Sequence, residues 1–184
     1  MTTRWLTSYE LAAWVRLASI LEMLPGALDG QLRRDAELTH FDYRVLSFLS
    51  ESENQTLRMT YLAQVTNATL PRLSHVVSRL EKRGYLRRSP CEEDRRATNA
   101  VLTESGWEKV VAAAPGHVEA VRSLVLDGLS PEQVTQLTDI TSRILDRLDA
   151  GDTLRPLYAA HDADVTAEQA RRHPSVSADS ASLD

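Results

Sequence analysis

The chain has 184 residues, of which 42% are hydrophobic, and a formal net charge of −5. This length fits one compact domain with extensions, and the single cysteine, Cys91, excludes an intramolecular disulfide and a zinc site built from several cysteines. Met1 to Leu11 contains Arg4 and Glu10 and no long apolar run. We therefore expect neither a signal peptide nor a membrane anchor there, but a soluble cytoplasmic protein.

The N-terminal part of the chain is predicted to be helical. Apolar residues in the range 11–24 recur at helical spacing, which predicts a first helix that begins near Thr7. Pro25 interrupts the pattern, but the spacing resumes towards Ala36, in which case the proline kinks one long helix instead of ending it. Thr39 suits the N-cap of a second helix, which carries Phe41 and further apolar residues.

The middle of the chain combines a short helix, a tight turn and another helix. Residues 56–58 are predicted as a short strand and residues 59–64 as a short helix. Thr69 suits the N-cap of the next helix, and Pro71 lies in its first turn, where a missing N–H costs little. This helix, over residues 70–83, ends at Gly84. Its predicted buried face consists of Leu70, Leu73, Val76, Val77 and Leu80.

A two-stranded hairpin is predicted to follow this helix. Residues 85–88 are typical of a strand, residues 89–96 of a polar loop and residues 97–102 of the returning strand. Because two strands alone are not a stable sheet, the hairpin must lean on the helices or on the strand at 56–58. The segment therefore predicts a winged helix-turn-helix, and the arginine-rich loop tip would reach a minor groove.

The distribution of charge supports a nucleic-acid partner, although the net charge does not. From Thr56 to Pro90 there are seven basic residues and one acid, Glu81, which gives +6. From Asp149 to Asp184 the net charge is −4. A basic middle therefore sits between acidic ends, and this distribution matters more than the sum.

Two further helices are predicted after the hairpin. Thr103 suits an N-cap, and Pro115 with the adjacent Gly116 predicts a bend in the helix that follows. Ser130 and Pro131 begin a last helix, whose apolar residues repeat at steps of three and four. Such stripes indicate a face that packs on a partner helix, either in a second copy or within the same subunit.

Here the chain resembles the MarR family of bacterial transcription regulators. Asp94-Arg95-Arg96, followed by Leu102-Thr103 and Gly106, is similar to the family's DxRx(n)LTxxG wing signature, and residues 62–86 are similar to its recognition segment. The resemblance implies a mainly α fold with a small β wing, in which a winged helix-turn-helix lobe is joined to N- and C-terminal dimerisation helices. It also implies a homodimer on a pseudo-palindromic operator.

The domain organisation follows from this resemblance together with the predicted elements. We expect an N-terminal dimerisation helix in residues 1–37, the DNA-binding lobe in 38–103, C-terminal dimerisation helices in 104–149 and an acidic, flexible tail in 150–184. The expected dimerisation residues are Leu11, Trp14, Val134, Leu137, Ile144 and Leu148.

Double-stranded DNA is the expected partner. We expect the first turns of the helix at 70–83 to enter the major groove and the residues beyond them to hold phosphates. Either wing arginine would reach the minor groove. The resemblance implies that Asp94 orients this arginine through an ion pair. The expected DNA-binding residues are Thr69, Pro71, Arg72, Ser74, His75, Arg79, Arg88, Arg95 and Arg96.

Regulation by a small molecule is implied by the resemblance alone. Many family members release DNA when a small aromatic or anionic effector binds between the dimer helices and the lobe, so a repressor relieved by a ligand is expected. By rough position the effector site includes Trp14, His40, Tyr43 and Arg44, although each also suits ordinary packing. Cys91 offers an alternative, a thiol redox sensor, but an inert wing cysteine is the favoured interpretation.

Enzymatic motifs are absent from the sequence. It contains no Gly-rich phosphate loop, no GxSxG and no HExxH, and its five histidines are scattered. We therefore expect no catalytic site, no metal and no cofactor. The remaining alternative is a winged domain that contacts proteins without binding specific DNA.

Overall fold

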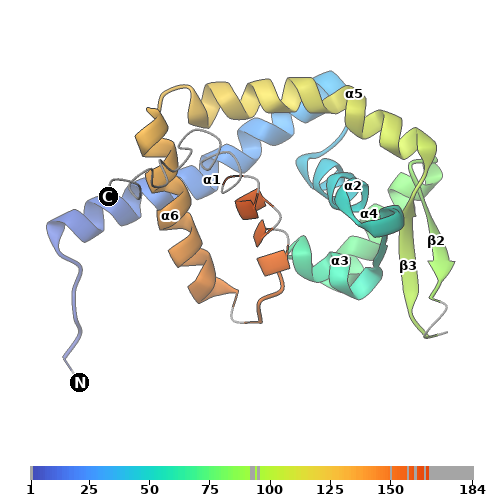
Figure 1. Cartoon of the computed structure of the whole chain (residues 1–184), viewed down its shortest axis with the longest axis horizontal. Helices are drawn as coiled ribbons and strands as arrows, with labels where there is room; N and C mark the ends of the chain where they lie inside the picture. Colours follow the sequence, from blue (N-terminus) through green and yellow to red (C-terminus); the bar gives the residue numbers. More distant parts are fainter. Residues whose placement is uncertain are drawn as a thin grey trace, which may run out of the picture. The chain divides into compact units, whose positions relative to one another are not determined.

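The computed structural model describes residues 2–91, 94, 96–149, 151–156, 158–159, 161–163 and 165. Most of them lie in helices, and a small sheet completes the fold (Figure 1). The elements in chain order are α1 (Ser8–Ala36), α2 (His40–Glu51), η1 (Glu53–Gln55), β1 (Thr56–Arg58), α3 (Met59–Val65), α4 (Leu70–Lys82), β2 (Leu86–Pro90), β3 (Thr98–Leu102), α5 (Glu104–Val121), η2 (Arg122–Leu126) and α6 (Pro131–Leu148).

The long first helix begins at a capping box. The Thr7 hydroxyl accepts a hydrogen bond from the Glu10 backbone N–H, and the Glu10 carboxylate accepts one from the Thr7 N–H at 2.7 Å. The helix continues through Pro25 to Ala36, as the one-helix alternative predicted. Among the described residues α1 alone is long and apolar enough, by length and composition, to cross a membrane.

The core of the lobe is aliphatic and lies between α2, α3, α4 and the sheet. α2 begins at a second capping box, in which the Asp42 carboxylate accepts a hydrogen bond from the Thr39 N–H at 3.0 Å. Leucine and valine dominate the fully buried positions, because they fill space without polar atoms. The largest of these side chains are Leu32, Leu38, Leu46, Leu49, Leu62, Leu73, Leu80, Leu86, Val45, Val65 and Val77.

The sheet has the order β1-β3-β2, and both pairs are antiparallel. The predicted strand at 56–58 pairs with β3, with Leu57 opposite Ala100, so the hairpin does lean on it. In β2, Leu86 lies opposite Leu102 and both are buried, which directs one face of the wing base into the core.

The predicted N-cap at Thr103 joins the wing to α5. The Thr103 hydroxyl donates to the Gly84 carbonyl at 2.6 Å and accepts from the Gly106 N–H at 3.1 Å. Gly106 packs so closely on the preceding corner that a Cβ there would lie 2.7 Å from Leu102 Cδ1 and nearer still to the Tyr85 carbonyl oxygen. Only glycine fits this position, which explains the glycine of the LTxxG motif.

One prediction about the core is wrong. Leu70 was expected on the buried face of α4, but it is 45% exposed, whereas the other four members of that stripe are buried. Leu70 is the first residue of α4, and the core is covered by the turns that follow it. Its side chain therefore lies beyond the edge of the core. Gly84 has a φ of 78° and ends the helix as predicted.

The described residues form two compact units, Met1–Gln136 and Leu137–Asp184. The first contains the lobe together with α1 and α5, and α5 packs along α1 within it (Figure 1). The second contains most of α6 and the segment after it. The tail predicted to be flexible comprises residues 150–184, of which residues 166–184 lie outside the described residues.

Candidate nucleic-acid interface

The outer face of α4 presents polar and basic side chains at its first turns. Thr69 caps the helix, since its hydroxyl accepts a hydrogen bond from the Arg72 N–H at 3.4 Å. Pro71, Arg72 and His75 are exposed, and Ser74 is half-buried. The helix therefore offers a positive end with a guanidinium and an imidazole beside it, which suits a phosphate or a base edge.

Arg72 is positioned by α2. Its guanidinium carbon lies 4.6 Å from the centroid of the Phe41 ring, a cation–π arrangement. A stacked guanidinium keeps its N–H groups at the ring edge free to donate, and the contact restricts the rotamers of a long side chain. The geometry therefore preorganises Arg72 at the surface.

Arg79 is tied to the start of α2. Its Nη2 lies 2.5 Å from Asp42 Oδ1. Asp42, which also caps α2, is buried, with 2% of its surface exposed. The Asp42 carboxylate thus serves the α2 cap with one oxygen and Arg79 with the other. Sequence reasoning missed this pair, because 37 residues separate its members.

Arg88 fastens the wing to α4. Its Nη1 donates to Glu81 Oε2 at 2.8 Å, and its Nη2 donates to the Ser74 carbonyl at 2.9 Å and to Ser78 Oγ at 2.9 Å. The Arg88 N–H also donates to Glu81 Oε1 at 2.9 Å. A contact of Arg88 with DNA stays a prediction, but its guanidinium already donates hydrogen bonds within the lobe. We call this set, Arg88, Glu81, Ser74 and Ser78, the wing clamp.

The tip of the wing is ordered by Asp94. Its carboxylate accepts a hydrogen bond from the Arg96 N–H at 3.0 Å, and its carbonyl accepts one from the Ala97 N–H at 2.8 Å. Arg96 is exposed. Arg95 lies outside the described residues, so the expected ion pair with Asp94 stays a prediction there.

Cys91 lies at the base of the wing tip and is buried. Arg58 Nη2 donates to its sulfur at 3.3 Å. Burial restricts the access of an oxidant to this thiol, which favours the inert wing cysteine over the redox sensor.

A cluster of buried and half-buried polar side chains lies where α1, α2 and α5 meet. The ring centroids of Tyr43 and His117 are 4.6 Å apart, and those of His40 and His117 are 6.2 Å apart. Gln31 is buried beside them, and neither Gln31 Oε1 nor His117 Nδ1 has a hydrogen-bond partner among the described residues. Gln31 Nε2 instead donates to Asp35 at 2.9 Å. We call Gln31, His40, Tyr43 and His117 the junction cluster.

Burial governs the protonation of both histidines. It lowers the pKa of His40, and the nearby Arg44 and His117 lower it further against the opposing charge of Asp29. Burial also lowers the pKa of His117. Both imidazoles are therefore held in the neutral form to a lower pH than a free histidine.

The expected effector residues fall into two groups. His40 and Tyr43 belong to the junction cluster, and Arg44 is on the same helix, where its guanidinium donates to the Val65 carbonyl at 3.4 Å. Trp14 lies apart from them in the sequence, on the N-terminal half of α1, and is 54% exposed, so the alternative that it fills the core is wrong.

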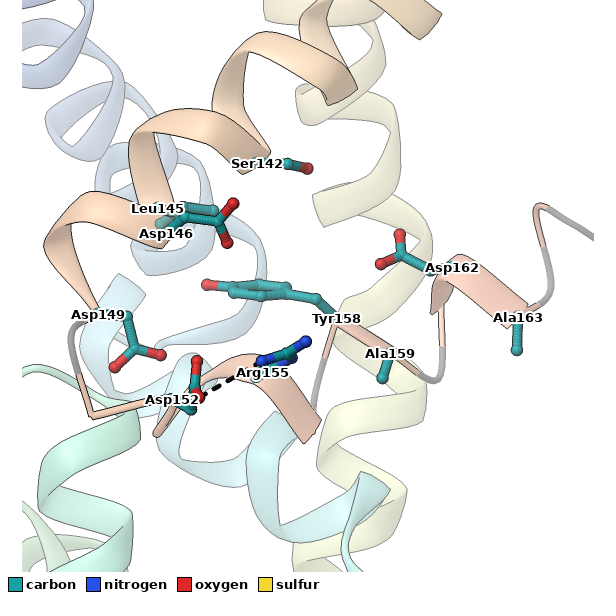
Figure 2. Close-up of a pocket in the computed structure, with 10 residues that line it drawn as sticks. All are labelled: Ser142, Leu145, Asp146, Asp149, Asp152, Arg155, Tyr158, Ala159, Asp162 and Ala163. Carbon is teal, nitrogen blue, oxygen red and sulfur yellow. Dashed lines mark hydrogen bonds and ion pairs between the residues drawn. The ribbon is translucent and has the colours of Figure 1, made fainter.

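A hollow of about 760 Å³ lies within the second unit (Figure 2). Four aspartates and one arginine line it, and Arg155 lies 3.4 Å from Asp152. Figure 2 shows the Tyr158 ring between the α6 side chains and this pair. An acidic lining disfavours phosphate and carboxylate ligands, so this hollow does not suit DNA or an anionic effector.

The described residues contain no group of three or more side chains suited to a metal ion.

Comparison with known proteins identifies the family. The chain is 44% identical to Sco3205 from Streptomyces coelicolor, a MarR family transcriptional regulator solved in complex with DNA, with a TM-score of 0.76 over 80% of this chain and 92% of that one. The profile described as MarR family matches residues 37–97. The chain belongs to the MarR family.

Other transcription regulators are similar to the chain over most or part of their length. The HTH-type transcriptional regulator YfiV from Bacillus subtilis is 32% identical over 147 residues, which cover 77% of this chain and 88% of YfiV. The transcriptional repressor MprA from Escherichia coli is 29% identical over 107 residues, which cover 58% of this chain and 60% of MprA. The predicted MarR resemblance is thereby confirmed: the chain is a transcription regulator and not an enzyme.

Proposed function

We propose that this MarR-family chain binds a pseudo-palindromic DNA operator as a homodimer. The observation that carries the proposal is the exposed, positively charged first half of α4, with Arg72 preorganised on Phe41 and Arg96 at the wing tip. The DNA complex of the similar Sco3205 supports it. A dimer presents two such lobes to two half-sites, which an operator with two-fold symmetry matches.

Each residue has a proposed role in this complex. Thr69, Pro71, Arg72, Ser74 and His75 lie at the major groove, with Arg72 as the main reader of base edges. Arg79 shares its guanidinium between Asp42 and a phosphate, which is possible because its side chain is 51% exposed. Arg95 or Arg96 enters the minor groove. Arg88 acts through the wing clamp instead of touching DNA.

The proposal is tested by selecting bound duplexes from a randomised library with the purified protein. We expect a symmetric consensus and a logarithmic affinity that falls steeply with salt, because each phosphate contact releases counterions. Arg72→Ala should cost about 1–3 kcal/mol on the selected duplex and less on random DNA. Arg143→Ala, at an exposed arginine of α6, is the matched control.

Two results would contradict this proposal. If Arg72→Ala weakened binding to selected and random duplexes equally, Arg72 would not read sequence. If no duplex were enriched, the chain would use its winged lobe for protein contacts, which is the remaining alternative.

The exposed apolar residues of α1 and α6 support a second copy as the partner of these helices. Leu11, Trp14, Ile144 and Leu148 are all exposed, whereas Val134 and Leu137 are partly covered. Arg16 and Glu22 interrupt the apolar surface of α1, and such charges disfavour a membrane span. We therefore assign the apolar composition of α1 to dimerisation in a cytoplasmic protein.

Repression relieved by an effector is the regulatory part of the proposal. The name of MprA, a transcriptional repressor, supports the sign of regulation. The junction cluster supports the proposed location of the effector site, because two of its polar atoms have no hydrogen-bond partner among the described residues and because it connects the lobe to α1 and α5. Benzoate, a simple aromatic carboxylate, should lower operator affinity if the site accepts such anions, and Arg44→Ala should abolish that response. If benzoate leaves the operator affinity unchanged, the effector is not a simple aromatic carboxylate.

A further inference from the structure

Leu70 is an apolar side chain at the point where α4 would meet DNA. It is the first residue of the helix, directly after the Thr69 cap, and almost half of it is exposed. A single exposed leucine needs no explanation by itself. Its surroundings, however, form a defined surface.

Leu70 lines a groove of about 240 Å³ between α4 and the wing. Met59 and Thr60 of α3 form one side, and Ala97 and Thr98 form the side towards the wing. Leu70, Met59 and Ala97 supply apolar groups to the groove, and Arg96 supplies a positive charge. The groove is therefore suited to an apolar group that belongs to an anionic molecule.

Two of the polar side chains that line this groove, Ser74 and Arg88, are hydrogen-bonded to each other within the protein. Ser74 Oγ lies 3.3 Å from Arg88 Nη2, and Arg88 is held in the wing clamp. Selectivity in this groove therefore depends mainly on shape and apolar contact, and less on hydrogen bonds.

The proposed docking places one DNA strand over this groove. The backbone of that strand separates the major groove, which α4 enters, from the minor groove, which the wing enters. Leu70, as the first residue of α4, would lie on the major-groove side of this backbone, next to the base edges. The major-groove edge of thymine carries a C5 methyl group, and no other standard base has an apolar group there. A leucine has no donor or acceptor and can distinguish bases only through that methyl.

We propose that Leu70 is a specificity-determining residue that selects thymine by contact with its C5 methyl group. This inference rests on the proposed function, because it requires α4 to enter the major groove. It assigns a base-reading role to a residue outside the DNA-binding residues expected from the sequence. Burial of one methyl group is worth about 0.8 kcal/mol, which corresponds to a roughly fourfold change in affinity.

The test uses a duplex selected from a randomised library by the full-length protein, in which each thymine is replaced singly by uracil. This change removes only the methyl and leaves the hydrogen-bonding edges intact. We expect one thymine per half-site at which the wild type binds about fourfold more weakly after replacement. 5-Bromouracil, whose bromine fills the space of the methyl, should restore the affinity. Leu70→Ala should lose about the same factor on thymine and nothing further on uracil.

Controls separate a failure of this inference from a failure of the proposed function. Leu70 is exposed, so Leu70→Ala should keep the circular dichroism and melting temperature of the wild type. Leu6→Ala, at a leucine of similar exposure before α1, is the matched control. If no duplex is enriched, the proposed function fails. If a duplex is enriched but no thymine responds to uracil, or if Leu70→Ala responds as the wild type does, Leu70 does not read thymine.

Discussion

Gly106 is the residue at which a single added carbon should matter most. A Cβ there would meet Leu102 and the backbone of Tyr85, and backbone cannot move aside as the end of a flexible side chain can. Gly106→Ala should therefore lower the free energy of unfolding by about 1–3 kcal/mol or more, by overpacking this corner. Urea denaturation measures the change. Gly128→Ala, where nothing lies within 4 Å, is the control and should have little effect.

At the residue scale, local roles could be predicted and distant partners could not. The N-caps at Thr39, Thr69 and Thr103 depend on hydrogen bonds to residues three positions away, and all three are confirmed. The pairing of Arg79 with Asp42 depends on how α2 and α4 pack, which periodicity does not encode. Leu70 fitted the apolar stripe of its helix, but the stripe does not reveal where the core ends.

At the element scale, the wing clamp should set the angle between β2 and α4. Arg88→Ala should weaken binding to a selected duplex because the wing loses its support, while the salt dependence stays unchanged. Glu81→Gln should weaken binding as well, since it removes the negative partner of Arg88. Fluorescence anisotropy at several salt concentrations measures both variants.

A phosphate contact by Arg88 would give a different pattern. Loss of such a contact reduces the salt slope by about 1. Glu81→Gln would then leave affinity unchanged or increase it, because it removes a competing negative charge from the interface. Either result would show that Arg88 contacts DNA directly.

The junction cluster predicts a pH dependence of stability. Burial lowers the pKa values of His40 and His117 in the folded protein, so the unfolded chain binds protons first as the pH falls. The free energy of unfolding should be largest above the ordinary histidine value of about 6.5 and should decrease as the pH falls below it towards the lower folded values. Chemical denaturation between pH 7.5 and about 5, at fixed protein concentration, measures this slope.

Variants assign this pH dependence to the cluster. His117→Gln keeps a polar side chain at the junction and removes the titrating ring, so the slope below about pH 6.5 should become shallower. His75→Gln, at an exposed histidine of α4, is the matched control for the substitution itself. An equal slope in His117→Gln and wild type would assign the dependence to other groups.

At the scale of the whole molecule, the flanking helices expose apolar side chains that a second copy would cover. The lobe contains the aliphatic core, whereas α1 and α6 expose large apolar side chains such as Trp14 and Leu148, the latter at 76%. The sequence predicted the helices and their stripes, because helical spacing is a local property. It left open whether the stripes pack within one subunit, and in the described residues much of their apolar surface stays exposed.

Disruption of this apolar surface should therefore separate the copies and weaken DNA binding together. Leu11→Glu places a charge on α1 that a dimer interface would bury, so light scattering at micromolar concentration should change from about twice 20.5 kDa to a value near 20.5 kDa. Operator affinity should fall by about 10²–10⁴-fold, because two linked lobes bind far more tightly than one. Val165→Glu, at another exposed apolar residue, should change neither quantity. If the wild-type chain is already monomeric, there is no such interface. If the Leu11→Glu variant remains dimeric with full operator affinity, the dimer interface lies elsewhere.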